Sequence, residues 1–283
     1  MVTRIAVTGA GGFIGRHVLD ALSAAGGSEV IAVTRSGWQG ELPHGVRHMR
    51  MDLSMPSPDA WQMLDRPDVL VHLAWGGLPN YSSHHHFESE LPVHYRFLKG
   101  LVEQGLPALL CAGTCFEYGM REGMLHESQQ PQPHNCYAFA KDALRRQLGF
   151  LREQHAFALT WARLFYTYGP GQPAASLYGQ FQAAVVRGER EFPMSGGEQL
   201  RDYLPVQEVA RLVGALALSK ADAGIVNVCA GGPTSVRKLV EGWAQEQNWP
   251  GALALGRYPY PRHEPMAFWG SNAKLRRVLE AAA

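Results

Sequence analysis

The chain has 283 residues, of which 46% are hydrophobic and 18% are charged, a composition that suits a globular protein and excludes a disordered one. Its 26 basic and 25 acidic residues leave a formal net charge of +1, so no bulk electrostatic field favours nucleic acid or an anionic membrane. No apolar run approaches the roughly 18 residues of a membrane span, so we expect no membrane partner, and any anionic ligand must be bound by a local site.

Short apolar runs alternate with helical stretches over residues 1–165, which is typical of repeated βα units. The runs are apolar nearly throughout, as expected for strands of a parallel sheet with helices over both faces. The sequence therefore predicts an α/β protein with a Rossmann-type doubly wound parallel sheet. The expected strands are Arg4–Thr8, Glu29–Thr34, His48–Met51, Val69–Leu73, Ala108–Ala112, Leu159–Leu164 and Ile225–Cys229.

Between and after these strands, the apolar periodicity predicts seven helices. The polar segment 120–135 contains two prolines and is interpreted as a loop, and glycine-rich breaks follow at 169–171 and 195–197. The expected helices are Phe13–Ala25, Phe87–Gln104, Tyr137–Gln154, Ser176–Arg187, Val206–Ser219, Val236–Gln247 and a short one near Asn272–Ala281.

These breaks indicate two domains. We expect a dinucleotide-binding domain over residues 1–168, with 202–230 returning to it. A smaller, chain-discontinuous α/β substrate-binding domain is expected from 169–201 and 231–283, a size within the usual domain range.

The start of the chain and its cysteines bear on the compartment. Met1 leads at once into an apolar stretch and a turn, which leaves no room for a cleaved signal peptide. Four cysteines, Cys111, Cys115, Cys136 and Cys229, fit neither a disulfide framework nor a zinc spacing. We expect a cytoplasmic protein.

Three consecutive histidines, His84 to His86, raise the question of a metal site. Successive residues on a loop rarely converge on one ion, and no carboxylate or cysteine is spaced to complete the ligand set. We interpret the run as a solvated loop and expect no metal.

The segment Thr8–Gly15 follows the first strand directly and opens the first helix. Gly9, Gly12 and Gly15 allow a tight turn, a close approach to a pyrophosphate and close packing of helix on strand. The N–H groups of Phe13, Ile14 and Gly15 then point at the phosphates. An ordinary glycine-rich turn is the alternative. The position of the motif favours a dinucleotide site, and the glycine spacing resembles that of short-chain dehydrogenases.

The second strand ends at Thr34 and is followed by Arg35, where an NAD-preferring protein would offer Asp or Glu to the ribose hydroxyls. A guanidinium pairs bidentately with a 2′-phosphate, whereas a carboxylate repels it. The sequence therefore favours NADP, with NAD as a possible cofactor if Arg35 is only a solvated loop charge.

Tyr137 and Lys141 lie one helical turn apart at the start of an expected helix. A phenol with a pKa near ~10 is a poor base at neutral pH, and a neighbouring ammonium favours the phenolate. Such a pair can exchange a proton with a hydroxyl or carbonyl oxygen while hydride moves to or from carbon. From spacing alone, a surface pair is the alternative.

Further motifs extend this pattern over most of the chain. Thr114 is followed by Tyr118-Gly119, as in the Ser/Thr-x-x-x-Tyr-Gly motif of the extended short-chain dehydrogenase/reductase family, which includes nucleotide-sugar epimerases, dehydratases and reductases. The chain resembles this family also in the segments 163–165, 168–172, 201–206 and 227–232.

The resemblance implies roles for particular residues. Thr114, Tyr137 and Lys141 would form the catalytic group, with the threonine hydroxyl bonded to the substrate oxygen that is oxidised or reduced. It also places Asp52 and Leu53 near the adenine. Cofactor-binding residues would further include Leu73, Ala74 and Lys141 itself.

Some positions depart from the family pattern. Dehydratases carry Asp-Glu after the catalytic threonine, whereas this chain has Cys115 and Phe116, which excludes dehydration chemistry of that kind. Tyr166 stands where an asparagine is frequent. The helix from Phe87 lacks the asparagine common there, and Glu90 is its nearest polar residue. Cys115 and Cys136 are interpreted as small packing residues.

Substrate binding is expected from Thr114, Tyr137, Tyr166 and two arginines. The resemblance implies that Arg201 pairs with the diphosphate, with a structural bridge to Asp202 as the alternative. Arg262 resembles a second diphosphate contact.

The favoured activity is NADPH-dependent reduction of a nucleotide-diphosphate 4-keto-6-deoxyhexose to the 4-hydroxy sugar. An epimerase with retained NAD is the first alternative and a non-catalytic dinucleotide sensor the second. Relatives pair through the helices near 87–104 and 137–154, so a homodimer is a further expectation.

Overall fold

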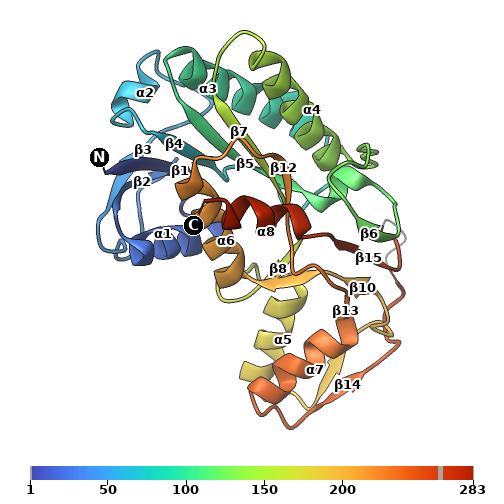
Figure 1. Cartoon of the computed structure of the whole chain (residues 1–283). Coiled ribbons are helices and arrows are strands. Elements are labelled where there is room, and N and C mark those ends of the chain that lie inside the picture. Colours follow the sequence, from blue (N-terminus) through green and yellow to red (C-terminus); the bar gives the residue numbers. More distant parts are fainter. Residues whose placement is uncertain (1, 261–263, 283) are drawn as a thin grey trace.

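The computed structural model describes residues 2–260 and 264–282 (Figure 1). Its centre is a seven-stranded sheet of order β12-β7-β5-β4-β1-β2-β3 in which all neighbours are parallel. The strand order reverses at β1, the switch point of a doubly wound sheet, so the predicted fold class is confirmed. The strands are β1 (Thr3–Thr8), β2 (Ser28–Thr34), β3 (Val46–Arg50), β4 (Val69–His72), β5 (Ala108–Thr114), β7 (Ala158–Leu164) and β12 (Gly224–Val228).

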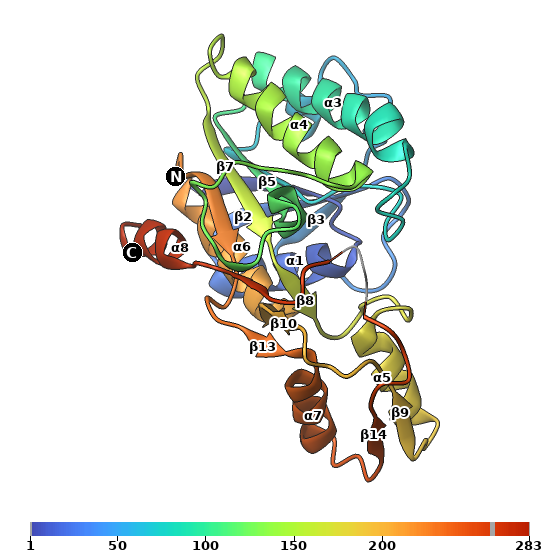
Figure 2. The same cartoon turned by 90° about the vertical axis from the view of Figure 1, so that its right-hand side faces the viewer.

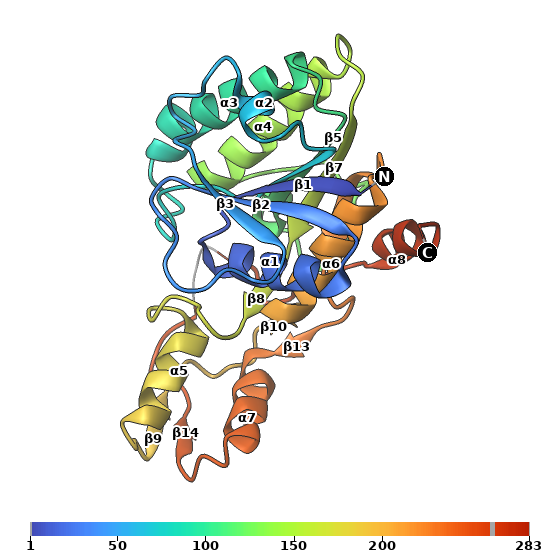
Figure 3. The same cartoon turned by 90° about the vertical axis from the view of Figure 1, so that its left-hand side faces the viewer.

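Helices cover both faces of this sheet, each with its own apolar core (Figures 1 and 3). The first face carries α1 (Phe13–Ala25), α6 (Val206–Ser219) and the C-terminal α8 (Ala273–Glu280). The opposite face carries α2 (Ala60–Met63), α3 (Leu91–Glu103) and α4 (Cys136–Leu151). Burial on both faces explains why these strands are apolar nearly throughout.

The expected helix Phe87–Gln104 differs in its first turn. A π-helical turn, η1 (His86–Glu90), precedes α3, in which Pro92 occupies the first turn. Helix α4 begins after Asn135, whose side-chain oxygen accepts the N–H of Ala138 at 2.8 Å and so satisfies a donor that the helix leaves unpaired.

Short strands join segments that are far apart in the sequence. The expected loop 120–135 contains β6 (Gly123–Leu125), which pairs in parallel with β15 (Phe268–Gly270), so the interpretation of that whole segment as loop is wrong. Similarly, β8 (Tyr166–Tyr168) pairs with β11 (Tyr203–Pro205). Three-residue strands carry no readable periodicity, and their partners are not adjacent in the chain.

A second, smaller group of elements lies beyond the carboxyl ends of the sheet (Figure 2). It packs around a separate apolar cluster centred on Phe181 and Trp243. The elements of this group are α5 (Leu177–Val186), β9 (Glu191–Pro193), β10 (Leu200–Arg201), β13 (Thr234–Ser235), α7 (Val236–Glu246) and β14 (Ala252–Ala254). The domain boundaries given above remain a prediction. Among the described helices, none has the length and apolar character that crossing a bilayer requires.

Candidate active site

A cleft of about 570 Å³ opens where β1, β2, β3 and β4 end. Four loops line it, each following a strand of the central sheet. They contribute residues within 8–12, 33–39, 51–54 and 74–76, joined by part of helix α3. Ligands of doubly wound sheets bind in such a crevice outside the carboxyl ends of the strands, so the sheet topology positions this site.

The glycines of the first loop are required by close contacts. Gly9 has φ +70°, and a Cβ there would lie 2.6 Å from the backbone nitrogen of Ala74. A Cβ on Gly15 would overlap the carbonyl oxygen of Gly9. Helix α1 begins at Phe13 with Gly12 as its N-cap and has no side-chain cap. The N–H groups of its first turn therefore remain available to an anion, and the loop fits a dinucleotide pyrophosphate.

Two guanidinium groups lie along the cleft wall. Arg35 is exposed directly after β2, and Arg16 lies 4.9 Å from the centre of the Trp38 ring. Asp52 accepts hydrogen bonds from the side chain and the backbone N–H of Ser54. These bonds lower the pKa of the Asp52 carboxyl, and the charge of Arg35 has a smaller effect in the same direction. Arginines and a carboxylate thus share this end of the cleft.

Other expected cofactor residues lie at the same edge of the sheet. Leu53 and Ala74 line the cleft, and Leu73 donates its N–H to the Thr8 carbonyl at 3.1 Å. Phe13 and Ile14 form the first turn of α1. Of the residues predicted for cofactor binding, Gly9, Gly12, Arg35, Asp52, Leu53 and Ala74 thus line one cleft, whereas Phe13, Ile14, Gly15, Leu73 and Lys141 are not part of its lining.

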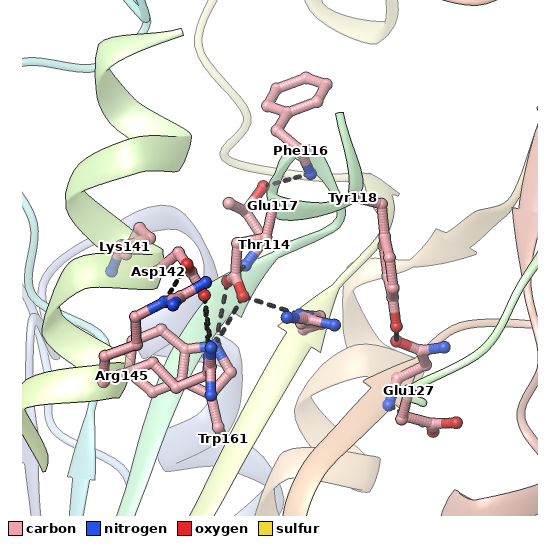
Figure 4. Close-up of polar contacts among 12 residues, drawn as sticks. Thr114, Phe116, Glu117, Tyr118, Glu127, Lys141, Asp142, Arg145 and Trp161 are labelled. Atoms are coloured by element: carbon pink, nitrogen blue, oxygen red, sulfur yellow. Dashed lines mark hydrogen bonds and ion pairs between the residues drawn. The ribbon is translucent and has the colours of Figure 1, made fainter. Parts of the chain in front are cut away.

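Thr114 ends β5, and hydrogen bonds to the turn that follows fix its conformation. Its hydroxyl accepts the N–H of Phe116 at 3.3 Å, and its N–H donates to the carboxylate of Glu117 at 2.8 Å (Figure 4). This reciprocal pair is a capping box for the short 3₁₀ helix η2 (Cys115–Tyr118). The threonine side chain is thereby fixed at the carboxyl end of the sheet.

Tyr137 and Lys141 project from the first turns of α4, with only 9% and 2% of their surfaces exposed. The Lys141 ammonium donates to the Ala112 carbonyl at 2.9 Å and lies 4.0 Å from the centre of the Trp75 ring. No salt bridge to Lys141 occurs among the residues that the structure describes. Burial lowers the pKa of Lys141 to about 8, so the ammonium predominates at neutral pH but titrates much closer to it than an exposed lysine does.

The Tyr137 phenol lies in an aromatic enclosure. Its ring is 5.3 Å from that of His86, 5.6 Å from that of Tyr81 and 6.1 Å from that of Trp75. Burial raises the pKa of Tyr137, while its hydrogen bond with Thr114 opposes that rise. The phenol is therefore protonated in this state and is placed to donate its proton.

Beneath Thr114 lies a buried ion pair that the sequence motifs did not predict. Glu117 is fully buried and accepts from Arg163 Nε at 2.7 Å and from Trp161 Nε1 at 2.9 Å (Figure 4). It also holds the Thr114 backbone, as described above. The pair therefore fixes the ends of β5 and β7 relative to η2. Arg163 belonged to a recognised motif, but nothing in the sequence identified Glu117 as its partner.

A chain of hydrogen bonds beside the cleft was likewise missed. Thr8 Oγ1 lies 2.8 Å from His72 Nδ1, and His72 Nε2 lies 2.9 Å from His94 Nδ1. His94 Nε2 lies 3.0 Å from a carboxylate oxygen of Glu90. The four-residue spacing of Glu90 and His94 on a helix was the one signal available.

Glu90, the last member of this series of hydrogen bonds, determines which group donates and which accepts in each bond. The hydrogen bond from His94 holds the pKa of Glu90 at about 2, so Glu90 is an acceptor only. Burial lowers the pKa values of His72 and His94, so both rings are neutral. His94 therefore donates to Glu90, His72 donates to His94, and Thr8 donates to His72.

The histidine run differs from expectation. His86 is fully buried, accepts a hydrogen bond from Trp75 Nε1 at 3.1 Å and donates to the Asn80 carbonyl at 2.8 Å. Its interpretation as part of a solvated loop is wrong, because Trp75 and Tyr137 enclose it. The described residues contain no cluster of His, Cys, Asp and Glu suited to a metal ion.

The expected substrate residues lie on the other side of Thr114. Arg201 is buried, and its guanidinium pairs with Glu264 at 3.0 Å and lies 4.7 Å from the centre of the Phe268 ring. Asp202 accepts backbone N–H groups after β12, so the alternative of an Arg201–Asp202 bridge is wrong. Tyr166 has a buried hydroxyl without a hydrogen-bond partner in the described structure. Arg262 lies outside the described residues.

Both cysteines next to the catalytic candidates occupy packed positions. Cys115 is buried in an apolar cluster with Phe165 and Phe268. Cys136 is half-buried, and its Sγ donates to the Ser82 carbonyl at 3.1 Å. Burial raises the pKa of Cys115, which disfavours its thiolate.

Comparisons with known proteins match the whole of this architecture. Residues 5–229 match the model of the NAD dependent epimerase/dehydratase family. A dTDP-6-deoxy-L-talose 4-dehydrogenase (NAD(+)) of Aggregatibacter actinomycetemcomitans is 29% identical, over 95% of this chain and 99% of the relative. A dTDP-6-deoxy-L-talose 4-dehydrogenase (NAD(P)(+)) of Kitasatospora kifunensis is 28% identical, over 87% and 80%. Among solved structures, MoeE5 in complex with UDP-glucuronic acid and NAD is 28% identical with a TM-score of 0.81, over 98% and 92% of the two chains.

Proposed function

The chain belongs to the NAD dependent epimerase/dehydratase family, and we propose that it reduces the 4-keto group of a nucleotide-diphosphate 4-keto-6-deoxyhexose with NADPH. The observation that carries this proposal is the convergence of Thr114, Tyr137 and Lys141 beside Trp75, which itself lines the cofactor cleft. The curated relatives described above are named as nucleotide-sugar 4-dehydrogenases, which supports oxidoreductase chemistry at the corresponding sugar carbon.

In the direction of reduction, Tyr137 would serve as the acid. Reduction of a ketone needs an acid to protonate the developing alkoxide, and a phenol whose pKa is raised by burial keeps its proton until that moment. Oxidation, the first step of an epimerase, would need the phenolate instead. The neighbouring Lys141 stabilises the phenolate that remains after the proton is given up.

NADPH, when bound, would supply the hydride that the keto carbon receives. Thr114 donates a hydrogen bond to the keto oxygen, and Tyr137 transfers its proton to that oxygen, which becomes the product hydroxyl. Tyr137 is then reprotonated from solvent. Cys115 and Phe116 offer no acid–base pair for elimination of water, so the reaction ends at the hydroxyl.

Arg35 is the reason for preferring NADPH. The two dehydrogenases named above share a substrate name but differ in cofactor, one being named for NAD(+) and the other for NAD(P)(+). Cofactor choice within this group therefore varies between relatives. An exposed guanidinium at the end of β2 can pair with a 2′-phosphate, and this supports a preference for NADPH.

Activity assays test the proposal against its two alternatives. The purified protein is supplied with NADPH or NADH and with dTDP- or GDP-linked 4-keto-6-deoxyhexose, and both cofactor and sugar are followed. Stoichiometric oxidation of NADPH with formation of a 4-hydroxy sugar is expected. Sugar inversion by protein that carries NAD, without net cofactor consumption, would instead identify an epimerase. Dinucleotide binding with no turnover of any nucleotide sugar would identify a sensor.

A further inference from the structure

Trp75 has an unusual place among the residues around Lys141. It follows β4 and lines the cofactor cleft, and its ring lies 4.0 Å from the Lys141 ammonium. Among the described residues, the other contacts of the charged group are the Ala112 carbonyl at 2.9 Å and the more distant Tyr137 ring at 5.9 Å. An aromatic face attracts a cation through its quadrupole, most strongly where water is excluded, as it is here.

The orientation of this ring is itself fixed. The indole N–H donates to His86 Nδ1 at 3.1 Å, and His86 in turn donates to the Asn80 carbonyl. The ring of His94 stacks on Trp75 with a centroid distance of 4.7 Å and an interplanar angle of 11°. The hydrogen-bond chain from Glu90 fixes His94. Two buried histidines therefore determine the plane on which the ammonium rests.

We propose that Trp75 is a positioning residue that holds the Lys141 ammonium at the active site in place of a carboxylate. This inference rests on the proposed function, because the proposed reaction is what requires a charged Lys141 beside Tyr137. A lysine ammonium has three N–H donors, of which one is used by Ala112. A carboxylate would accept a hydrogen bond from a second N–H of the ammonium and attract the charge toward itself. The indole ring attracts the charge without taking an N–H bond, which leaves donors for a ligand.

The ring also favours the charged form of Lys141. Burial lowers the pKa of this lysine, and a cation–π contact acts in the opposite sense. Removing the ring should therefore lower the pKa of Lys141 further. The ammonium would then be lost at a lower pH, and with it the support that Tyr137 receives during turnover.

The test compares Trp75→Leu, Trp75→Phe and the control Trp61→Leu. Trp61 is a half-buried tryptophan on the same apolar cluster, and its ring lies below Arg66, at 5.9 Å, rather than below Lys141. We expect the alkaline limb of the pH profile of kcat/KM to move to lower pH by about half to one unit in Trp75→Leu. Trp75→Phe, which keeps a ring, should restore most of the wild-type profile, and Trp61→Leu should match the wild type.

A second readout needs no turnover. The difference in unfolding free energy between a protein and its Lys141→Met partner changes with pH as Lys141 titrates. We expect this change to begin at a lower pH in the Trp75→Leu background than in the wild-type background. If Trp75→Leu does not fold, Trp75→Met replaces it, since the flexible methionine side chain adapts to an irregular gap without introducing a ring.

The outcomes separate this inference from the proposed function. If Lys141→Met is inactive but the pH profile and the linked stability step of Trp75→Leu coincide with those of Trp61→Leu, Trp75 is a packing residue and the inference is overturned. If Lys141→Met retains full activity, the catalytic assignment fails, whatever Trp75 does to the stability step. A shifted profile in Trp75→Leu with rescue in Trp75→Phe supports both.

Discussion

Two buried cations lie near the carboxyl end of the central sheet, and they differ in whether a carboxylate pairs with them. Arg163, on β7, is fully buried and pairs with the fully buried carboxylate of Glu117 at 2.7 Å. Lys141, on α4, is almost as deeply buried but has a carbonyl oxygen and an aromatic ring as its partners. Figure 4 shows Lys141 and Glu117 on neighbouring elements of the same region.

The difference separates a structural charge from a reactive one. A buried ion pair is costly to break, because the remaining charge is left without a partner in a medium of low dielectric constant. Glu117 thus fixes the strands that carry Thr114. A buried cation without a counter-ion stays close to losing its proton, which makes its charge responsive to a ligand or to a neighbouring phenol. The first arrangement makes the site rigid, and the second makes it reactive.

The largest effect is expected where the ion pair is broken. Glu117→Gln keeps the shape of the side chain but removes its charge, so Arg163 is left buried and unpaired. The free energy of unfolding should fall by about 3–5 kcal/mol. Urea denaturation measures this loss.

The matched control for that variant is Glu208→Gln, which breaks an exposed pair with Arg211 on α6. Exposed pairs contribute about 1 kcal/mol or less, so this variant should remain close to the wild type. Equal losses from the two substitutions would remove the distinction between the two regions.

The next effect concerns the reactive region. Tyr137→Phe removes one hydroxyl, so NADPH binding should persist while kcat falls by about 100-fold or more, the usual contribution of general acid–base catalysis. The unfolding free energy should change little, in contrast to Glu117→Gln. Steady-state kinetics and cofactor titration are the measurements. Tyr178→Phe, in the smaller group of elements, is the control with a retained ring and should be fully active.

Lys141→Met should move stability and activity in opposite directions. The lysine carries its charge into a buried position, so methionine should raise the free energy of unfolding at pH 7 by about 1–3 kcal/mol. Turnover and NADPH affinity should both fall. A variant that is less stable than the wild type at pH 7 would mean that the ammonium is well solvated or paired.

The pH dependence of that difference has a definite sign. Below pH 8, Lys141 is charged in both the folded and the unfolded chain, and the folded state bears the full cost of burial. Between the folded pKa of about 8 and the ordinary value of 10.5, only the unfolded chain keeps the proton. The stability of the wild type relative to Lys141→Met therefore rises with pH over this window, so the advantage of the variant shrinks.

The sequence predicted the fold because its main elements carry local signals. Helices α1 and α6 have the predicted bounds, and the seven strands of the sheet were found because burial on both faces makes them apolar. Strands such as β6 and β15 were missed because two segments 145 residues apart pair only after folding.

The candidate site shows the same division. Motifs identified the glycine loop and Thr114, Tyr137 and Lys141, since each motif is a local arrangement on one strand or helix. Trp75 could not be identified in this way, because its role depends on β4, α3 and α4 meeting. The partner of Arg163 and the chain from Thr8 to Glu90 depend equally on convergence. The assigned roles of the motif residues remain predictions for the experiments above.

The smallest effect is expected from an exposed cation, which completes the comparison. Arg35 is exposed at the cleft edge after β2, and no described residue forms a salt bridge with it, so its removal should not alter folding. Its contribution should appear only with a ligand that carries a 2′-phosphate. Arg35→Ala should weaken NADPH binding by about 10-fold, close to 1.4 kcal/mol, and leave NADH binding unchanged. The exposed control is Arg47→Ala. Arg47 lies at the amino end of β3, away from the cleft, and pairs with Asp65, so this variant should bind both cofactors as the wild type does. Titration of both cofactors against the three proteins measures this directly. Wild-type protein that binds NADH as tightly as NADPH would show that Arg35 does not select the cofactor, and would favour an epimerase with retained NAD.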